Sequence, residues 1–289
     1  MVETKVSNGS IELVIGGGRP TVTIGERINP SGKKKLTAAL QAGDMDFVRQ
    51  EALAQVQVGA DMLDVNVAAL GVDEVKLLPE AVKVVTEAVG VPLCIDSTNP
   101  AALEAALKVY KGKALVNSVH GEEASLNAVL PIIKEYGAAV VGLTMDDTGI
   151  PKDADTRVKI AAKIVARAEK LGIPRENIVI DCLARTMAAE SQSGPAVLEA
   201  VRRVRDELGV NQTLGAGNVS FYMPERHLLT GTFLAMVIGF GVTCPIVDVA
   251  TVRPYILAAD LVMGRDNHAL RYIRGFRERQ KRKAEKEEK

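Results

Sequence analysis

Residues 92–100 read Pro-Leu-Cys-Ile-Asp-Ser-Thr-Asn-Pro. The stretch begins as a short apolar run of strand type, and this run stops at the carboxylate of Asp96. Asn99 followed by Pro100 is a pair typical of an N-cap and a first helical position. The stretch therefore predicts a buried strand with a polar end, followed directly by a helix.

The same polar stop recurs along the chain. Seven apolar runs end in a carboxylate or an amide, and an eighth run ends in Thr144-Met145-Asp146. The seven ends are Glu26, Asp64 with Asn66, Asp96, Asn117, Asp181, Asn218 and Asp248. A buried strand interior cannot hold so many unpaired polar groups, because each one costs free energy without a partner. In a closed barrel of parallel strands, all of these ends meet at one rim.

Segments with helical periodicity lie between the strand runs. Four of them begin near Asp44, Asn99, Asp155 and Pro195. Two others carry apolar faces from Val75 to Val89 and from Leu126 to Ile133, and two more lie around 224–240 and 254–264. Alternating strands and helices imply parallel pairing through right-handed crossovers. Eight such units predict the α/β class and a closed (β/α)8 TIM barrel. An open Rossmann sheet would carry Gly-x-Gly-x-x-Gly after its first strand, and none occurs there.

The two ends of the chain fall outside this repeat. We expect residues 1–20 to form an N-terminal extension, a short strand or hairpin that plugs the bottom of the barrel. Residues 21–268 then form the barrel domain. Residues 269–289 are rich in Arg, Lys and Glu, which predicts a charged helical tail that is exposed to solvent and frays at its end.

Composition excludes several classes of protein. The chain of 289 residues has the length of one α/β barrel. Its net charge is zero and 3% of its residues are aromatic, so nucleic-acid binding is not expected. No apolar run is long enough for a membrane span, and no signal peptide is apparent. Cys94, Cys182 and Cys244 lack paired spacing, which favours buried reduced thiols in a cytoplasmic protein.

The predicted rim is rich in acids and amides and poor in cations, which does not suit a phosphorylated substrate. A carboxylate pairs with a guanidine-like edge through two parallel hydrogen bonds, and a pterin has such an edge. Asp96 and Asp181 are the natural acceptors, and Asn117 can both donate and accept. A single rim carboxylate could equally cap the next helix, but capping does not explain the whole set.

A His/Cys metal site is not expected, although a hard cation held loosely among the acids remains open. His120, His227 and His268 lie far apart, and neither His-x-x-x-His nor Cys-x-x-Cys occurs. The sequence also has no nucleophile elbow that would support a Ser-His-Asp triad.

Several motifs, all in order between about residues 21 and 265, resemble the methyltetrahydrofolate:corrinoid methyltransferases. They are Gly25-Glu26-Arg27-Ile28-Asn29, Leu63-Asp64-Val65-Asn66-Val67, Cys94-Ile95-Asp96-Ser97-Thr98-Asn99, Val116-Asn117-Ser118, Gly142-Leu143-Thr144-Met145-Asp146 and Gly217-Asn218-Val219-Ser220. This family shares its pterin-binding barrel with dihydropteroate synthase and with the folate domain of cobalamin-dependent methionine synthase.

The resemblance implies methyl transfer between N5 of tetrahydrofolate, or of 5-methyltetrahydrofolate, and the cobalt of a corrinoid. A partner protein carries the corrinoid and docks transiently at the barrel mouth. The implied catalytic residues are Asn218, which hydrogen-bonds near N5, together with Asp96 and Asp181. The implied pterin-binding residues are Glu26, Asp64, Asn66, Asp96, Asn117, Asp181, Asn218, Ser220 and Arg226. Phe221 stands where a relative has a polar side chain.

Two other functions remain open from the sequence. One is dihydropteroate synthase, although the late Ser-x-Arg-x-His element of that enzyme is missing. The other is a non-catalytic folate-binding protein. The family and the apolar late residues Phe233, Met236, Val237 and Phe240 also favour a homodimer, although these four positions could equally belong to the core.

Overall fold

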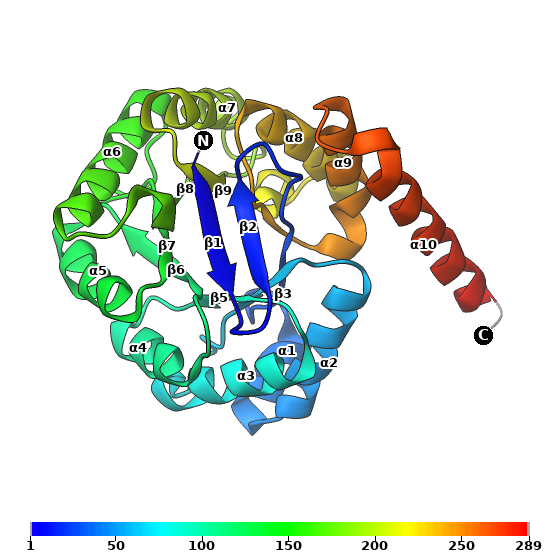
Figure 1. The fold of residues 1–289 in the computed structure, drawn as a ribbon, viewed down its shortest axis with the longest axis horizontal. Coiled ribbons are helices and arrows are strands. Elements are labelled where there is room, and N and C mark those ends of the chain that lie inside the picture. The colour runs from blue at the N-terminus through cyan, green and yellow to red at the C-terminus, as the bar shows by residue number, and fades with distance from the viewer. Residues whose placement is uncertain (1, 288–289) are drawn as a thin grey trace.

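Eight parallel strands form a closed barrel in the computed structural model, which describes residues 2–287 (Figure 1). The strands are β3 (Ile24–Ile28), β4 (Met62–Val65), β5 (Leu93–Asp96), β6 (Leu115–His120), β7 (Ala139–Leu143), β8 (Ile178–Asp181), β9 (Asn211–Thr213) and β10 (Ile246–Val247). They pair in chain order from β3 to β9, and β10 pairs with β3. A bridge between Gly215 and Ile246 closes the ring. The predicted TIM barrel is confirmed.

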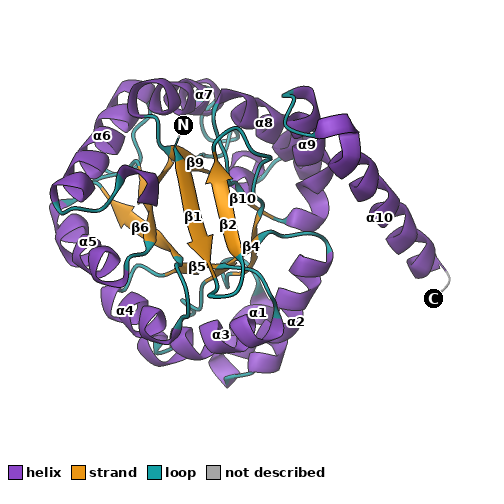
Figure 2. Ribbon diagram, in the orientation of Figure 1, coloured by secondary structure: helices purple, strands orange, loops and turns teal. Residues whose placement is uncertain are grey.

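A ring of helices surrounds the strands, and the last helix of the chain extends away from this ring (Figure 2). The helices are α1 (Lys34–Ala42), α2 (Met45–Gln57), α3 (Glu74–Ala88), α4 (Pro100–Val109), α5 (Glu123–Tyr136), α6 (Ala154–Lys170), α7 (Ser193–Arg203), α8 (Arg226–Phe240), α9 (Val249–Val262) and α10 (Leu270–Glu287). Asn99 caps α4, as predicted, by accepting a hydrogen bond from the backbone N–H of Ala101 at 3.0 Å. Asp96 is therefore not needed as a cap and is free to face the barrel mouth.

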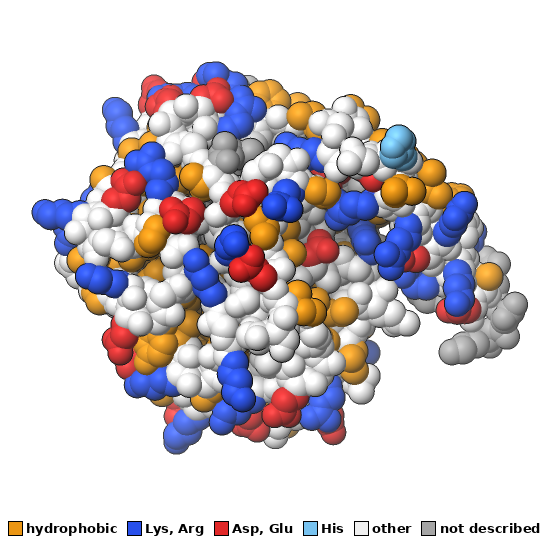
Figure 3. Space-filling view, viewed as in Figure 1, with side chains coloured by type: hydrophobic (Ala, Val, Ile, Leu, Met, Phe, Trp, Pro, Cys, Tyr) orange, Lys and Arg blue, Asp and Glu red, His pale blue; other side chains and the backbone are white. Residues whose placement is uncertain are grey.

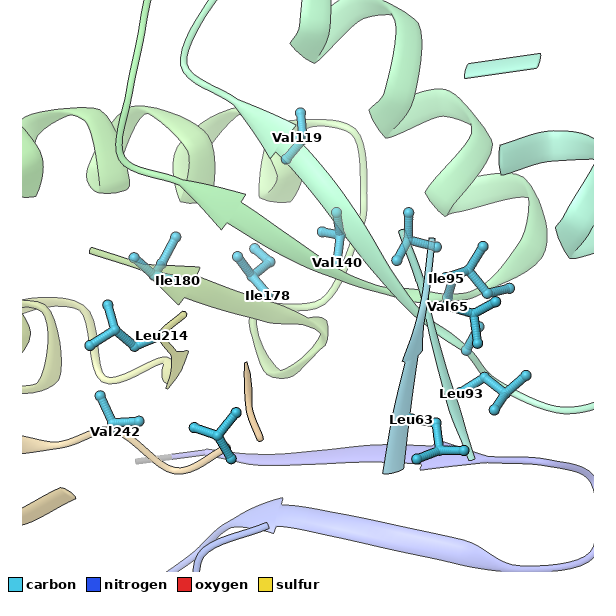
Figure 4. Packing of buried hydrophobic residues seen from close by; sticks show 14 of the residues in the cluster. Leu63, Val65, Leu93, Ile95, Val119, Val140, Ile178, Ile180, Leu214 and Val242 are labelled. Carbon is cyan, nitrogen blue, oxygen red and sulfur yellow. The ribbon is translucent and has the colours of Figure 1, made fainter. Parts of the chain in front are cut away.

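The core has two layers. Strand residues that point inward, such as Met62, Leu115 and Val179, fill the barrel interior. Residues that point outward pack against the helices, among them Leu63, Ile95 and others in Figure 4. Because strand side chains alternate between the two faces, each short strand contributes to both layers.

An antiparallel hairpin, β1 (Glu3–Ser7) and β2 (Glu12–Gly16), lies across one end of the barrel (Figure 1). The hairpin contacts residues that precede the barrel strands, so it covers the N-terminal ends of those strands. Val6 and Ile15 are buried with the inner core layer. Figure 3 looks onto this face and shows side chains of both charges over the hairpin. The opposite end of the barrel is therefore the one available to a ligand.

Asn211 fastens the hairpin to the barrel. Its amide donates hydrogen bonds to Val2 O at 3.0 Å, Thr4 Oγ1 at 2.9 Å and Ile15 O at 3.0 Å. Because Asn211 is fully buried, we expect Asn211→Ala to lower the free energy of unfolding by about 2–4 kcal/mol. Urea denaturation measures this change. Asn127→Ala, at an exposed position, is the control, and an equal loss in both variants would contradict the anchoring role.

Two sequence-based element assignments were wrong, and one helix was not predicted. The cap of α6 is Asp153, which accepts from Thr156 N–H at 2.7 Å, and not Asp155. The run that ends at Asn218 is not a strand, because β9 ends at Thr213 and Asn218 lies in the short 3₁₀ turn η3 (Ala216–Ser220). The sequence also gave no sign of α1 between β3 and α2.

The charged tail forms α10, which extends away from the barrel (Figure 1). Leu270, Ile273 and Phe276 of this helix are partly exposed. Across residues 2–287, no helix has both the length and the apolar character that crossing a membrane requires.

Candidate active site

The C-terminal ends of the strands surround a cavity of about 400 Å³, called here the acidic cavity. Its lining includes Glu26, Asn29, Lys33, Asp64, Asp96, Thr98, Asn117, Ser118, Leu143, Asp181, Gly217, Asn218, Phe221 and Arg226. This volume is within the range of small-molecule sites. Polar strand ends over an apolar barrel interior thus form one pocket, as the sequence predicted.

Asp64 and Asp96 are neighbours on one side of the cavity, at paired strands β4 and β5. Asn66 Nδ2 donates to Asp96 Oδ2 at 3.0 Å. Asn117 Nδ2 lies 3.4 Å from Asp64 Oδ1, the long end of the hydrogen-bond range. The amide of Asn66 therefore orients the carboxyl of Asp96, and the amide of Asn117 orients the carboxyl of Asp64.

Both carboxyls hold protons more tightly than an exposed aspartate. Burial raises the pKa of Asp64 well above its ordinary value, and the adjacent charge of Asp96 raises it further. Burial also raises the pKa of Asp96 to about 6, although the hydrogen bond from Asn66 opposes the rise. Two close carboxylates resist ionising together, which favours a pair that retains one proton.

Asp181 lies across the cavity at the end of β8. Its Oδ1 accepts a hydrogen bond from the backbone N–H of Leu183 at 2.6 Å. Leu183 has a φ of 57°, in the left-handed region that a leucine rarely adopts. The fully buried Arg157 holds this turn by donating to Cys182 O at 2.6 Å and to Leu183 O at 2.7 Å. Burial raises the pKa of Asp181 to about 6.

Glu26 enters the cavity from an irregular part of β3. The register of β3 against β4 shifts between Gly25 and Ile28, and such bulges change the direction of a side chain. Gly25 has no β-carbon, which leaves room for Gln55, and Gln55 Oε1 accepts from Arg27 N–H at 2.9 Å. Burial raises the pKa of Glu26 to about 7, while Lys33 opposes the rise.

Asn218 is exposed on η3 and faces the same cavity. Within residues 2–287, its side chain makes no hydrogen bond to the protein. The turn is fixed instead by Arg226, which donates to Gly217 O at 3.2 Å and to Ser220 Oγ at 3.2 Å. The Arg226 guanidinium also lies 4.6 Å from the ring centroid of Phe221, a cation–π distance. Asn218 is therefore held in place with its amide available to a ligand.

A second hollow of about 600 Å³, called here the outer cavity, shares residues with the acidic cavity. Glu26, Lys33, Gly217, Phe221 and Arg226 border both. His227, Thr230, Val252 and Asp248 line only the outer cavity. A ligand with a flat acid-bound end and a longer second part would fit across the two.

Most of the predicted site residues converge on these cavities, but not all. Asn66 does not line the acidic cavity and instead bonds to Asp96. Ser220 is fully buried and lies 2.8 Å from Thr230 Oγ1, so it supports the turn without facing the cavity. Asp146, one of the predicted rim ends, bonds to Thr148 in its own turn. Lys33 was missed, because it lies in a loop beyond the strand end.

No group of His, Cys, Asp and Glu suited to a metal ion occurs in the part of the chain that the structure describes. The three cysteines are free and buried, as predicted. Burial raises the pKa of the Cys94 and Cys182 thiols above their ordinary values, and it raises the pKa of Cys244 to about 12. None of the thiols is therefore suited to act as a thiolate nucleophile.

The buried carboxyls make the stability of the ligand-free protein depend on pH. The pKa of Asp181 is about 6 in the fold, above that of an unfolded aspartate, so the folded state binds the proton more tightly. Stability therefore decreases as the pH rises from about 4 to above about 6. We expect Asp181→Asn to be more stable than the parent by about 3 kcal/mol near pH 8 and equal to it below about pH 4. Chemical denaturation at several pH values measures the difference. The control is Asp147→Asn at an exposed position, and parallel curves for Asp181→Asn and the parent would contradict this account.

The family of pterin binding enzymes matches residues 25–248, which include every strand of the barrel except the start of β3. The chain belongs to this family. Over 267 residues, this pterin-binding enzyme is 30% identical to the methylcorrinoid:tetrahydrofolate methyltransferase of Eubacterium limosum, covering 89% of this chain and 96% of that protein. It is therefore a methyltransferase of the family that the sequence motifs resemble.

Other relatives are larger or more distant. The enzyme is 30% identical over 265 residues to methionine synthase of Mycobacterium tuberculosis, and this covers 87% of the chain but 22% of that longer protein. Among solved structures, it is similar to dihydropteroate synthase of Yersinia pestis with a pterine-sulfa conjugate, at a TM-score of 0.67, 15% identity and coverage of 90% of this chain and 100% of that one. Dihydropteroate synthase of Xanthomonas albilineans in complex with 7,8-dihydropteroate gives a TM-score of 0.64, 18% identity and coverage of 89% and 98%. At these identities the structural matches support the fold alone.

Proposed function

We propose that this enzyme transfers a methyl group between N5 of tetrahydrofolate and the cobalt of a corrinoid carried by a partner protein. The observation that carries the proposal is the acidic cavity, where Asp96, Asn117 and Asp181 face the same space as the unbonded amide of Asn218. The relative from Eubacterium limosum is named a methylcorrinoid:tetrahydrofolate methyltransferase, which supports the same reaction.

The pterin ring would lie in the acidic cavity. Its 2-amino group and adjacent ring N–H would donate to the carboxylates of Asp96 and Asp181, and Asn117 would bond to a neighbouring acceptor. Asp64 would keep the Asp96 charge in place through the shared proton. The aminobenzoyl-glutamate part would extend into the outer cavity beside Phe221 and Arg226.

The chemistry needs a protein that stabilises charge at N5. A tertiary amine is a poor leaving group, so N5 must gain positive character before its methyl group moves to a reduced cobalt. A hydrogen bond from Asn218 that strengthens as charge shifts stabilises the transition state more than the bound substrate. The cobalt is the nucleophile, so no protein nucleophile is required.

The direction of transfer is a separate part of the proposal. The same pocket can move a methyl group from 5-methyltetrahydrofolate to Co(I), or from a methylcorrinoid to tetrahydrofolate, by microscopic reversibility. Both directions require an open barrel mouth, because the corrinoid domain of the partner must reach the bound folate.

A spectroscopic assay tests the proposal. The protein is mixed with 5-methyltetrahydrofolate and Co(I) cobalamin, and we expect the absorbance of methyl-Co(III) to appear at a rate that depends on protein concentration. The reverse assay starts from methylcobalamin and tetrahydrofolate. Folate binding without transfer in either direction would favour a non-catalytic folate-binding protein, and condensation of a dihydropterin pyrophosphate with p-aminobenzoate would favour dihydropteroate synthase.

We also propose that the enzyme is a homodimer, although not all of the late apolar residues can contribute to its interface. Phe233 and Val237 of α8 are buried in the core of a single chain and are not available to a partner. Met236 is 45% exposed and remains available. Analytical ultracentrifugation gives the oligomeric state directly.

A further inference from the structure

Methyl transfer at N5 involves a proton as well as a carbon. When the methyl group leaves 5-methyltetrahydrofolate, the cobalt supplies the electron pair of the new Co–C bond and the C–N5 pair stays on nitrogen. N5 must take up one proton, no later than the methyl group leaves, to give the secondary amine of tetrahydrofolate. In the reverse direction N5 loses that proton. Asn218 can hydrogen-bond to N5, but a neutral amide does not supply a proton.

Each of the four carboxyls in the acidic cavity accepts a hydrogen bond from the protein. Asn117 donates to Asp64, Asn66 donates to Asp96, and the backbone N–H of Leu183 donates to Asp181. The partner of the Glu26 carboxyl is the backbone N–H of Asp248, and Lys33 Nζ donates to the backbone oxygen of Glu26 at 3.1 Å. Within the described residues, no side chain donates a hydrogen bond to the Glu26 carboxyl.

Glu26 also lies on the Asn218 side of the cavity. Its Oε1 lies 3.6 Å from the position that a β-carbon on Gly217 would occupy, so the carboxyl faces the turn that carries Asn218. Glu26 borders both cavities, whereas Asp64, Asp96 and Asp181 border only the acidic one. The carboxyl is thus next to the predicted position of N5 and in contact with the outer cavity.

We propose that the carboxyl of Glu26 exchanges this proton with N5. The inference rests on the proposed function. In transfer from folate, the Glu26 O–H bond breaks and an N5–H bond forms, leaving a carboxylate that regains a proton from water through the outer cavity. In the reverse direction the carboxylate accepts the N5 proton.

The charges around Glu26 suit this exchange. Burial raises the pKa of Glu26 to about 7, Asp248 adds to the rise, and Lys33 and Arg226 oppose it. Asp64 on the neighbouring strand β4, Asp96 on β5 and Asp181 on β8 face the same cavity. A carboxyl that titrates near neutral pH can both give and accept a proton under the same conditions, which is the optimum for general acid–base catalysis.

Glu26→Gln tests the inference, because glutamine keeps the size of the side chain but cannot give or take a proton. In single-turnover transfer from 5-methyltetrahydrofolate to Co(I) cobalamin, we expect the parent rate constant to fall as the pH rises through about 7. We expect Glu26→Gln to be slower by about 10²-fold and to lose this pH dependence. The folate Kd, measured by fluorescence titration, should change by less than about threefold.

Lys33→Gln is the matched variant. Removing this positive charge raises the pKa of Glu26, so the midpoint of the pH profile should move to higher pH in Lys33→Gln and vanish in Glu26→Gln. If Glu26→Gln does not fold, Glu26→Asp is used in its place, and infrared spectra follow the stretching band of the protonated carboxyl as the pH is raised through about 7. A carboxyl band that titrates identically in the parent and in Glu26→Asp would overturn the assignment.

The failures of the two proposals can be distinguished. If Glu26→Gln keeps the rate and the pH profile of the parent while Asn218→Ala still loses methyl transfer, the role of Glu26 is overturned. An absence of folate binding or of methyl transfer in the parent protein would instead overturn the proposed function.

Discussion

Replacing Asn218 with alanine is expected to slow methyl transfer by about 10³-fold while changing the folate Kd by less than about threefold. The reason is the position of the side chain, which faces the acidic cavity without a hydrogen bond to the described protein. Its bond to N5 would strengthen only as charge develops on that nitrogen. Single-turnover absorbance spectroscopy measures the rate, and equilibrium fluorescence measures the affinity.

The fold around Asn218 should survive this substitution. The side chain is exposed, and the turn is held by Arg226 and by backbone bonds that alanine retains. Thr98→Ala, at another exposed residue of the cavity lining, is the matched control and should stay within about threefold of the parent rate. An unchanged rate in Asn218→Ala would remove this residue from the mechanism.

The barrel could be predicted from the sequence because its signal is local. Runs such as Leu93–Asp96 contain both the strand and its polar end, and the helix cap at Asn99 follows at once. Repetition of this unit then limits the topology, since consecutive parallel strands need right-handed crossovers. The pocket follows from the same signal, because the polar ends of parallel strands lie at one face.

The strand β9 could not be predicted, because its partners are distant in sequence. Asn211, Gln212 and Thr213 are all polar, yet all are buried. Asn211 bonds to the N-terminal hairpin, Gln212 donates to Val201 O at 2.9 Å, and Thr213 donates to Cys244 O at 2.7 Å. Without those partners in view, the apolar residues after Thr213 are the better strand candidate.

Loop residues of the site were the other part that the sequence did not reveal. Lys33 reaches the cavity from the loop after β3, where it donates to Glu26 O and Asn29 O at 3.1 Å each. A lysine next to Lys34 and Lys35 carries no signal that separates it from solvent-exposed neighbours. Ser220 shows the opposite error, since it belongs to a family motif but is buried behind the turn.

Asp96→Asn is expected to raise the folate Kd by about 10²-fold, because a charge-assisted pair of hydrogen bonds contributes about 1.5–3 kcal/mol. Asparagine has a similar shape and keeps an oxygen that can accept from Asn66, so the cavity wall should remain intact. The decrease in folate affinity should therefore come from the lost charge and not from a change in the structure. Equilibrium fluorescence titration with tetrahydrofolate measures it.

The pH dependence gives an independent check on Asp96. Burial raises its pKa to about 6, and only the ionised form accepts both donors of a pterin edge. The affinity of the parent protein should accordingly be full above this value and decrease as the pH falls through it, while the affinity of Asp96→Asn should stay low throughout. Asp146→Asn is the matched control, because Asp146 also follows a strand but bonds within its own turn and does not line the cavity. An affinity of Asp96→Asn equal to that of the parent would count against binding of the pterin by this carboxylate, because the substitution removes the negative charge of Asp96 from the cavity.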